Sequence, residues 1–296
     1  MLAATRAVLA CPDCRGALRG DGDTLVCEGC GRRFSVDAGV PRLLPSESLG
    51  ATWEEKQALG ESDYEDGPPD TALAERFGRF ADVAGLVVDV GSGVEPRPAY
   101  LDDREGRTVV RVDPLVGEAP SELDFVQGVA ERLPFRDAAF DAAISATMLD
   151  HVPDPRRALE EIRRVVRPGG RLAVWIGVVD EGELRTNALG HLALPERRSL
   201  RELIRAYGVA GTASRAFRHL VWNRVRAAAT TLRLRFARRR VVAEVYADRA
   251  RYHFSFFEAD DVLELLRQTR FRVLASVRVE TEGAGTSLFV LAEAVD

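Results

Sequence analysis

Four cysteines lie within twenty residues as two Cys-x-x-Cys pairs: Cys11, Cys14, Cys27 and Cys30. Each pair forms a tight turn that directs two thiolates to one point, and a hairpin between the pairs brings all four together. Two disulfides would need an oxidising compartment, and a redox motif would need only one pair. Zinc is therefore the preferred interpretation. Four thiolates leave no open coordination position, so the zinc is predicted to be structural.

A second group of residues follows an apolar run, Leu86–Val90. The run contains Asp89 and ends in Gly91-Ser92-Gly93. Glycines let the backbone approach a ligand closely, and Asp89 suits the positive amine of an amino-acid moiety. Asp113 ends the next apolar run, where a carboxylate can accept hydrogen bonds from both ribose hydroxyls. Dinucleotide-binding enzymes share this pattern, so alone it is a weak signal.

Short β-rich runs alternate with helical patterns from residue 86 onward, which predicts a parallel sheet flanked by helices. The expected strands are Leu86–Val90, Thr108–Val112, Phe140–Ile144 and Arg171–Ile176. A helix is expected between the last two, with Asp154 as its N-cap and Pro155 at its first position. Ligands of such sheets bind at the carboxyl ends of the strands. Asp89 and Asp113 should therefore lie at the same edge.

Further motifs distinguish the possible families. They are Gly128-Val-Ala-Glu-Arg-Leu-Pro-Phe135, Phe140–Ser145, Leu149-Asp-His-Val-Pro-Asp-Pro155 and Val165–Leu172. In this order and spacing, the series resembles the class I S-adenosylmethionine (SAM) methyltransferases, especially those that modify small molecules and lipids. The resemblance covers about residues 86–176. The cysteine segment and its exit Gly39–Pro45 also resemble ribbons that precede such domains in bacterial methyltransferases.

This resemblance implies a Rossmann-like α/β fold with a seven-stranded sheet whose last strand is antiparallel. It also implies SAM as the methyl donor. Asp89, Gly91 and Gly93 would line the methionine part, Asp113 would hold the ribose, and Ala130 and Glu131 would lie near the adenine. The full set of implied cofactor-binding residues is Asp89, Gly91, Ser92, Gly93, Asp113, Ala130, Glu131 and Ser145.

Three positions depart from the family pattern, and the mildest is Ser92, which stands where relatives usually carry a cysteine or another small residue. Glu95 stands where relatives usually carry a third glycine, and Val94–Pro98 comes where their helix begins. Val129 stands where relatives often have an aspartate that contacts the adenine amino group. The changes at Glu95 and Val129 keep a non-catalytic scaffold open as an alternative.

Two histidines are candidate catalytic residues, because an accepting oxygen or nitrogen that holds a proton at neutral pH needs a general base. His151 follows Asp150 in a loop expected at the strand ends, and His253 precedes the helix expected at Glu258–Thr269. The alternative for His151 is a structural role in its loop.

The expected organisation has five parts: a zinc ribbon (1–45), a linker with helix (46–80), a SAM-binding core (81–180), an arginine-rich helical insertion (181–252), and a helix and β-hairpin that complete the core (253–296). Residues 201–251 hold thirteen arginines and three acidic residues, in a chain of net charge −5. Apolar side chains recur at helical spacing over 217–236. The preferred interpretation is a lid, with a peripheral membrane contact through 217–240 or a phosphate-binding element as alternatives.

The sequence thus predicts a SAM-dependent methyltransferase acting on an oxygen or nitrogen of a small-molecule, glycosyl or lipid-linked acceptor. The alternatives are an rRNA or tRNA methyltransferase and a non-catalytic scaffold. No apolar run approaches the roughly 20 residues of a membrane span, and the N-terminus lacks the features of a signal peptide. We therefore expect a cytoplasmic protein.

Overall fold

The computed structural model describes residues 3–20, 22–47, 71–117, 121–179, 253–281 and 285–296, together with 184, 205, 208–211, 225, 228–229 and 231–245. The chain forms two compact units. One comprises Met1–Val178 with Arg251–Asp296, and the other is Val179–Ala250. Residues 48–70 of the expected linker lie outside the described residues.

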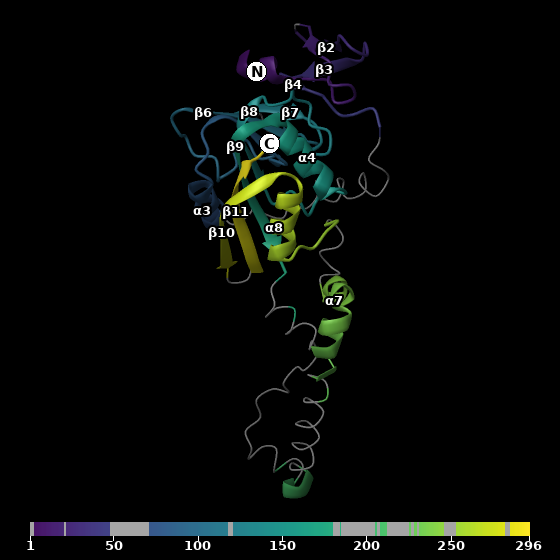
Figure 1. Ribbon diagram of the computed structural model, residues 1–296, viewed down its shortest axis with the longest axis vertical. Helices are drawn as coiled ribbons and strands as arrows, with labels where there is room; N and C mark the ends of the chain where they lie inside the picture. Colours follow the sequence, from purple (N-terminus) through teal and green to yellow (C-terminus); the bar gives the residue numbers. More distant parts are fainter. Residues whose placement is uncertain are drawn as a thin grey trace. The chain divides into compact units, whose positions relative to one another are not determined.

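The larger unit contains a seven-stranded sheet of order β10-β11-β9-β8-β5-β6-β7 (Figure 1). The strands are β5 (Gly85–Val90), β6 (Arg107–Asp113), β7 (Asp124–Gln127), β8 (Phe140–Ala146), β9 (Val166–Val178), β10 (Phe271–Thr281) and β11 (Gly285–Ala294). The last strand, β11, is antiparallel to both of its neighbours, whereas β9, β8, β5, β6 and β7 pair in parallel. The predicted fold class is confirmed.

Helices cover both faces of this sheet. The alternation of side chains along β5 separates two apolar clusters, because Val87 belongs to one and Val88 to the other. Helix α3 (Thr71–Ala81) contributes residues to the cluster that contains Val87. Its Phe77 packs against the rings of Trp175 in β9 and Phe289 in β11. The other cluster contains residues of α4 (Pro155–Val165) and α8 (Ala259–Gln268).

The N-terminal segment forms helix α1 (Ala3–Val8) and a small four-stranded antiparallel sheet. Its strands are β1 (Leu18–Arg19), β2 (Thr24–Cys27), β3 (Arg33–Asp37) and β4 (Val40–Pro41). This ribbon packs against the β7 edge of the large sheet, since the N–H of Leu43 donates to the carbonyl of Gln127 at 2.8 Å. Cys11, Cys27 and Leu43 share one buried apolar cluster with strand residues of the core.

A salt bridge strengthens the same junction. Glu161 of α4 is buried, and its carboxylate accepts from Arg15 of the ribbon at 3.0 Å and from the N–H of Leu133 at 3.0 Å. The ribbon and the methyltransferase-like core therefore share a continuous interior.

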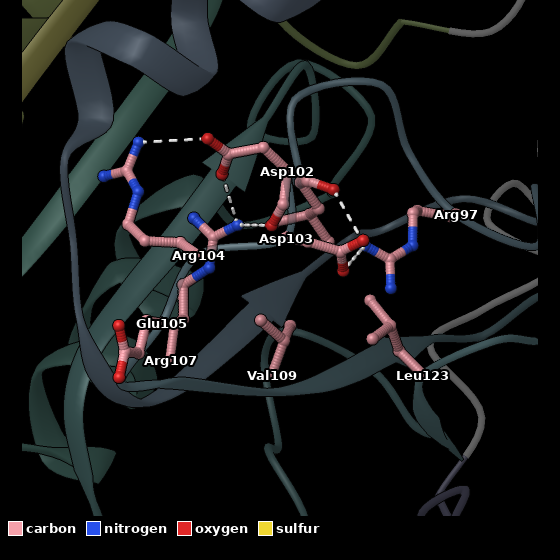
Figure 2. Close-up of a pocket in the computed structure, with 9 residues that line it drawn as sticks. Arg97, Asp102, Asp103, Arg104, Glu105, Arg107, Val109 and Leu123 are labelled. Carbon is pink, nitrogen blue, oxygen red and sulfur yellow. Dashed lines mark hydrogen bonds and ion pairs between the residues drawn. The ribbon is translucent and has the colours of Figure 1, made fainter.

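The connection between β5 and β6 differs from the helix that the family pattern implies. None of the residues 91–106, all of them described, is helical. This connection instead runs to a hollow of about 270 Å³ at the amino end of β6 (Figure 2). Ion pairs fix the chain there, including Arg97–Asp103 at 2.7 Å and Arg107–Asp102 at 2.6 Å. The hollow lies at the opposite end of β6 from Asp113.

Within the smaller unit, the structure describes helix α7 (Arg238–Val245) and short neighbouring stretches. Four members of the apolar pattern expected in the insertion are among the described residues and are exposed: Val225, Ala228, Leu232 and Phe236. The lid therefore stays a prediction. Among the described residues, no helix is long and apolar enough to cross a membrane.

Candidate active site

The loop after β5 approaches its neighbours so closely that glycine is required. Gly91 and Gly93 have φ angles of +69° and +72°, which side chains rarely adopt. A Cβ on Gly91 would lie 2.2 Å from Cγ of Met148, in the loop that follows β8. Gly91 thus lets the loop after β5 approach the loop after β8, whereas the close approach of a ligand that the glycines suggest stays a prediction.

Asp113 lies at the end of β6 and holds this loop. Its Oδ2 accepts from the N–H of Gly93 at 2.9 Å, and its Oδ1 accepts from the N–H of Leu115 at 2.9 Å. Burial raises the pKa of Asp113 to about 6, while these two N–H groups lower it. Each carboxylate oxygen has a second lone pair, which leaves acceptors for a ligand's hydroxyl groups.

Asp89 is fully buried in β5, beside the same loop. Burial raises its pKa to about 7, and the charge of Arg111 and the hydroxyl of Tyr100 lower it. The Tyr100 hydroxyl lies 3.0 Å from Oδ2 and 3.2 Å from Oδ1 of this carboxylate. A buried carboxylate with so high a pKa gains from a cationic partner, which suits the amine of an amino-acid moiety.

Arg111 is a candidate site residue that the sequence analysis did not single out. It is completely buried in β6. Its Nη1 donates to the carbonyl of Glu95 at 2.6 Å and of Pro96 at 3.1 Å, and its Nη2 donates to the carbonyls of Ser92 and Gly93 at 3.0 and 3.1 Å. One guanidinium therefore anchors the altered loop. An arginine inside the apolar run Thr108–Val112 was the available signal.

Two predicted cofactor-binding residues have buried hydroxyl groups without hydrogen-bond partners among the described residues. They are Ser92, in the glycine loop, and Ser145, in β8. Buried polar atoms are rarely left unsatisfied in folded proteins. Their positions at the carboxyl ends of adjacent strands fit a polar ligand, so the residues present fit SAM.

Ala130 and Glu131 lie in the turn after β7 and are buried. Burial raises the pKa of Glu131, and the backbone N–H groups of Glu131 and Asp154 lower it. Asp154 is the N-cap of α4, where its side chain accepts from the N–H of Arg157. Glu131 thus faces the start of α4, and its place near an adenine stays a prediction.

The structure brings the two candidate catalytic histidines together. The ring centroids of His151 and His253 are 4.5 Å apart with an interplanar angle of 81°. Nδ1 of His253 lies 3.8 Å from Oδ2 of Asp150. Asp150 was not among the predicted site residues. Its position directly before His151 in the sequence was the signal that could have indicated it.

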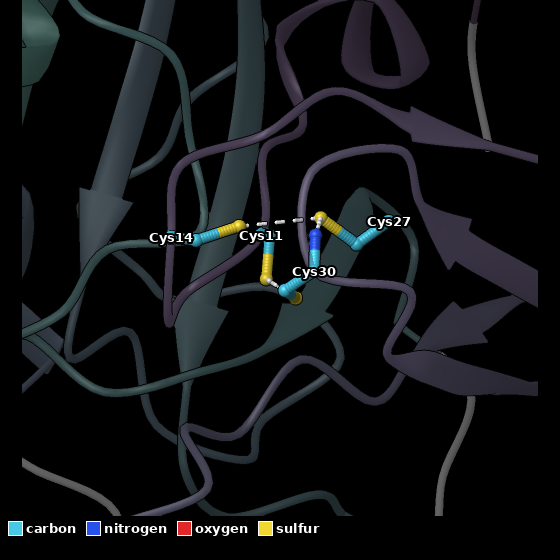
Figure 3. A group of neighbouring side chains, drawn as sticks. All are labelled: Cys11, Cys14, Cys27 and Cys30. Carbon is cyan, nitrogen blue, oxygen red and sulfur yellow. Dashed lines mark hydrogen bonds between the residues drawn. The ribbon is translucent and has the colours of Figure 1, made fainter.

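The cysteines converge as predicted (Figure 3). Sγ of Cys11 lies 3.7 Å from that of Cys30, and Sγ of Cys14 lies 3.3 Å from that of Cys27. A Cβ on Gly16 would lie 2.9 Å from Sγ of Cys27, so the absence of a side chain there lets the turn lie close to the sulfurs. Four sulfurs in this arrangement fit a zinc ion.

Comparison with known proteins agrees with this geometry. Residues 88–174 match the "Methyltransferase domain" family, and residues 4–39 match the family described as "Trm112p-like protein". The resemblance inferred from the motifs is confirmed for both parts. The role of each site residue stays a prediction.

Among curated relatives, a demethylmenaquinone methyltransferase of Paenarthrobacter aurescens is 49% identical over 98 residues, which are 31% of this chain and 37% of that protein. A ubiquinone/menaquinone biosynthesis C-methyltransferase of Methylobacterium nodulans is 36% identical over 99 residues, 31% of this chain and 39% of that protein. The chain thus spans about two fifths of the length of these relatives.

Among solved structures, the 1,6-didemethyltoxoflavin-N1-methyltransferase of Burkholderia thailandensis, with bound 1,6-didemethyltoxoflavin and S-adenosylhomocysteine, superposes with a TM-score of 0.50. It is 17% identical, and the match covers 93% of this chain and all of that one. At this identity the likeness shows the fold alone.

Proposed function

We propose that this chain, which carries a class I SAM methyltransferase domain behind a Trm112p-like four-cysteine ribbon, methylates a small-molecule acceptor. The observation that carries the proposal is the convergence at one edge of the sheet. The carboxylates of Asp89 and Asp113 and the unpartnered hydroxyls of Ser92 and Ser145 lie at the ends of adjacent strands.

These residues have distinct roles in the proposal. Asp89 pairs with the amine of the bound donor, and Asp113 accepts from its ribose while it fixes Gly93. SAM supplies an activated methyl group on a sulfonium centre, so the protein's main task is to place donor and acceptor in line. Arg111 holds the loop that defines this place.

We infer that the acceptor binds at the cluster of Asp150, His151 and His253. The loop that carries Asp150 and His151 follows β8, and its Met148 packs against Gly91 of the cofactor loop. An acceptor with a hydroxyl or amine group must lose a proton during transfer, and titratable side chains beside it activate it. The accepted methyl group is placed on oxygen or nitrogen.

Carbon is the second candidate for the accepting atom. One relative, from Methylobacterium nodulans, is a C-methyltransferase of ubiquinone and menaquinone biosynthesis, and it is 36% identical over 99 residues. An acceptor with a hydroxyl on an aromatic ring unites both candidates, because loss of the hydroxyl proton makes both the oxygen and the adjacent ring carbon nucleophilic.

RNA is the remaining enzymatic alternative. The ribbon carries opposite charges in close pairs, such as Arg32 with Asp13 and Arg19 with Glu28. RNA binding needs a surface with excess positive charge. This pairing disfavours the ribbon as an RNA-binding surface and supports the small-molecule proposal.

The proposal can be tested with SAM labelled in its methyl group. The zinc-loaded protein is incubated with total RNA, and separately with a bacterial small-molecule extract enriched in hydroxyaromatic compounds. We expect label in a small molecule, and none with an Asp113→Ala variant. Label in RNA alone would overturn the proposal. Mass spectrometry and NMR of the product then identify the accepting atom.

A further inference from the structure

Three potential metal ligands outside the cysteine ribbon lie together near the carboxyl end of β8, where we propose that the acceptor binds. The ligand atoms of Asp150, His151 and His253 all lie within 4.8 Å of one another. Two of the residues are adjacent in sequence, and the third comes about a hundred residues later. The fold therefore creates this set.

Backbone hydrogen bonds hold the two segments against each other. The N–H groups of Phe254 and Ser255 both donate to the carbonyl of Asp150, at 2.7 and 3.4 Å. Within the loop after β8, the N–H of His151 donates to the carbonyl of Met148 at 2.9 Å. Phe257 also forms a parallel bridge with Val178, at the end of β9. The backbones that carry all three ligands are thus fixed before any ion binds.

The three side chains of the cluster differ in their exposure to solvent, so the cluster is anchored on one side and accessible to a ligand on the other. Asp150 is buried, whereas His151 and His253 are partly exposed. Ligand atoms that share an ion at about 2.1 Å can be up to about 4.2 Å apart. Small side-chain rotations are enough to close the cluster around an ion.

We propose that Asp150, His151 and His253 bind a divalent transition-metal ion. Two imidazoles and one carboxylate suit such an ion, and three protein ligands leave positions open for an oxygen of the acceptor. The inference rests on the proposed function for its purpose, since the ion would bind the acceptor's hydroxyl oxygen and lower its pKa.

The overall reaction balances without a redox partner. The hydroxyl proton leaves to solvent, and a bond forms between the methyl carbon and the acceptor. The bond between that carbon and sulfur breaks, and its electron pair goes to sulfur, which yields the neutral thioether S-adenosylhomocysteine. The ion keeps its charge throughout.

The probe for this site is Mn²⁺, because manganese suits carboxylate and water oxygens, whereas thiolates such as those of the ribbon select softer metals. The full-length protein with its ribbon loaded with zinc is titrated with Mn²⁺, and free Mn²⁺ is followed by electron paramagnetic resonance. We expect one Mn²⁺ per chain. Asp150→Asn, His151→Ala and His253→Ala should each weaken binding at least about tenfold, whereas Asp260→Asn, an exposed carboxylate on α8, should leave it unchanged.

Thermal unfolding shows whether each variant is folded, and calorimetric binding of S-adenosylhomocysteine to the same samples separates the two proposals. If all three cluster variants weaken manganese binding, the metal site is supported. This holds even if S-adenosylhomocysteine does not bind and the proposed function fails. Cofactor binding without manganese binding, or manganese binding insensitive to the cluster variants, would overturn the metal site and leave the proposed function intact. The three side chains would then act as a metal-free acid–base group.

Discussion

The two clusters of potential metal ligands in this chain are built in opposite ways. The cysteine ligands occupy a single stretch of twenty residues, whose turns bring the sulfurs together locally. Asp150, His151 and His253 come from two segments that meet only because β8, β9 and the chain before α8 pack together. Local sequence specifies the first cluster, and tertiary structure specifies the second.

Their chemistry differs accordingly. Four thiolates would complete the coordination of zinc, so the first cluster can only stabilise the fold. Two imidazoles and one carboxylate leave positions open to a ligand, so the second can act on one. Damage to the ribbon should therefore appear as lost stability, and damage at the strand ends as lost binding.

The largest effect is expected for Cys27→Ser. Cys27 is buried in the apolar cluster that the ribbon shares with the core, so loss of zinc should destabilise both. We expect the free energy of unfolding to fall by about 5 kcal/mol or more. This should lower the melting temperature by about 10 °C or more. Thermal unfolding and zinc analysis measure this. A variant without zinc that melts like the wild type would show that the ribbon's metal is dispensable.

The next effect is expected for Arg111→Lys. Lysine keeps the positive charge but not the planar fork that donates to four loop carbonyls. Affinity for S-adenosylhomocysteine should fall about tenfold or more, with a smaller loss of stability than for Cys27→Ser. Arg97→Lys, in the ion pairs at the other end of β6, is the control. Equal affinity of both variants would contradict the anchoring role.

A pH dependence follows from Asp89. Its pKa of about 7 means that the carboxylate is largely protonated at pH 6 and largely ionised at pH 7.5. Affinity for S-adenosylhomocysteine should therefore rise about five- to tenfold over this range, because only the ionised form attracts the ligand's amine. Calorimetry across this range measures it. Tyr100→Phe should shift the rise to higher pH, and Asp89→Asn should abolish it.

The same two carboxylates affect stability in the opposite direction. Folding raises the pKa of Asp89 to about 7 and of Asp113 to about 6, so the folded state binds more protons than the unfolded state. The ligand-free protein should lose part of its stability as the pH rises from about 4 to 7. Urea unfolding of the wild type and of Asp89→Asn measures this. An equal pH dependence in both proteins would contradict the raised pKa of Asp89.

The smallest effects are expected for Ser92→Ala and Ser145→Ala. Their hydroxyls have no hydrogen-bond partner among the described residues, so their removal should change stability by less than about 0.5 kcal/mol. Affinity for S-adenosylhomocysteine should fall about three- to tenfold, the worth of one hydrogen bond. The exposed Ser35→Ala is the control. Lost stability with unchanged affinity would mean that these hydroxyls serve the fold alone.

Most of the fold could be predicted because its signals are local. Alternating apolar runs indicated β5, β6 and β8, and an N-cap with proline indicated α4. Strand β7 was missed because Asp124–Gln127 is short and contains only two buried residues. Strand β9 begins at Val166, earlier than expected, because Arg167–Gly170 continue as strand after the helix.

The candidate site was predictable only in part. The candidate cofactor-binding residues were chosen from motifs, and their roles stay predictions. The contact of Tyr100 with Asp89 comes from a connection that has no helix, and no sequence pattern indicates it. The meeting of His151 and His253 likewise depends on the packing of distant segments. Such contacts are set by tertiary structure, which spacing along the chain does not encode.

The most direct test of the central claim is calorimetric titration of the zinc-loaded protein with S-adenosylhomocysteine, beside an Asp113→Ala variant. We predict binding of one ligand per chain, weakened at least about tenfold by the substitution, because Asp113 fixes Gly93 and, in the proposed site, accepts from the ribose of the ligand. Failure of the folded, zinc-loaded protein to bind would contradict a methyltransferase site and favour the scaffold alternative.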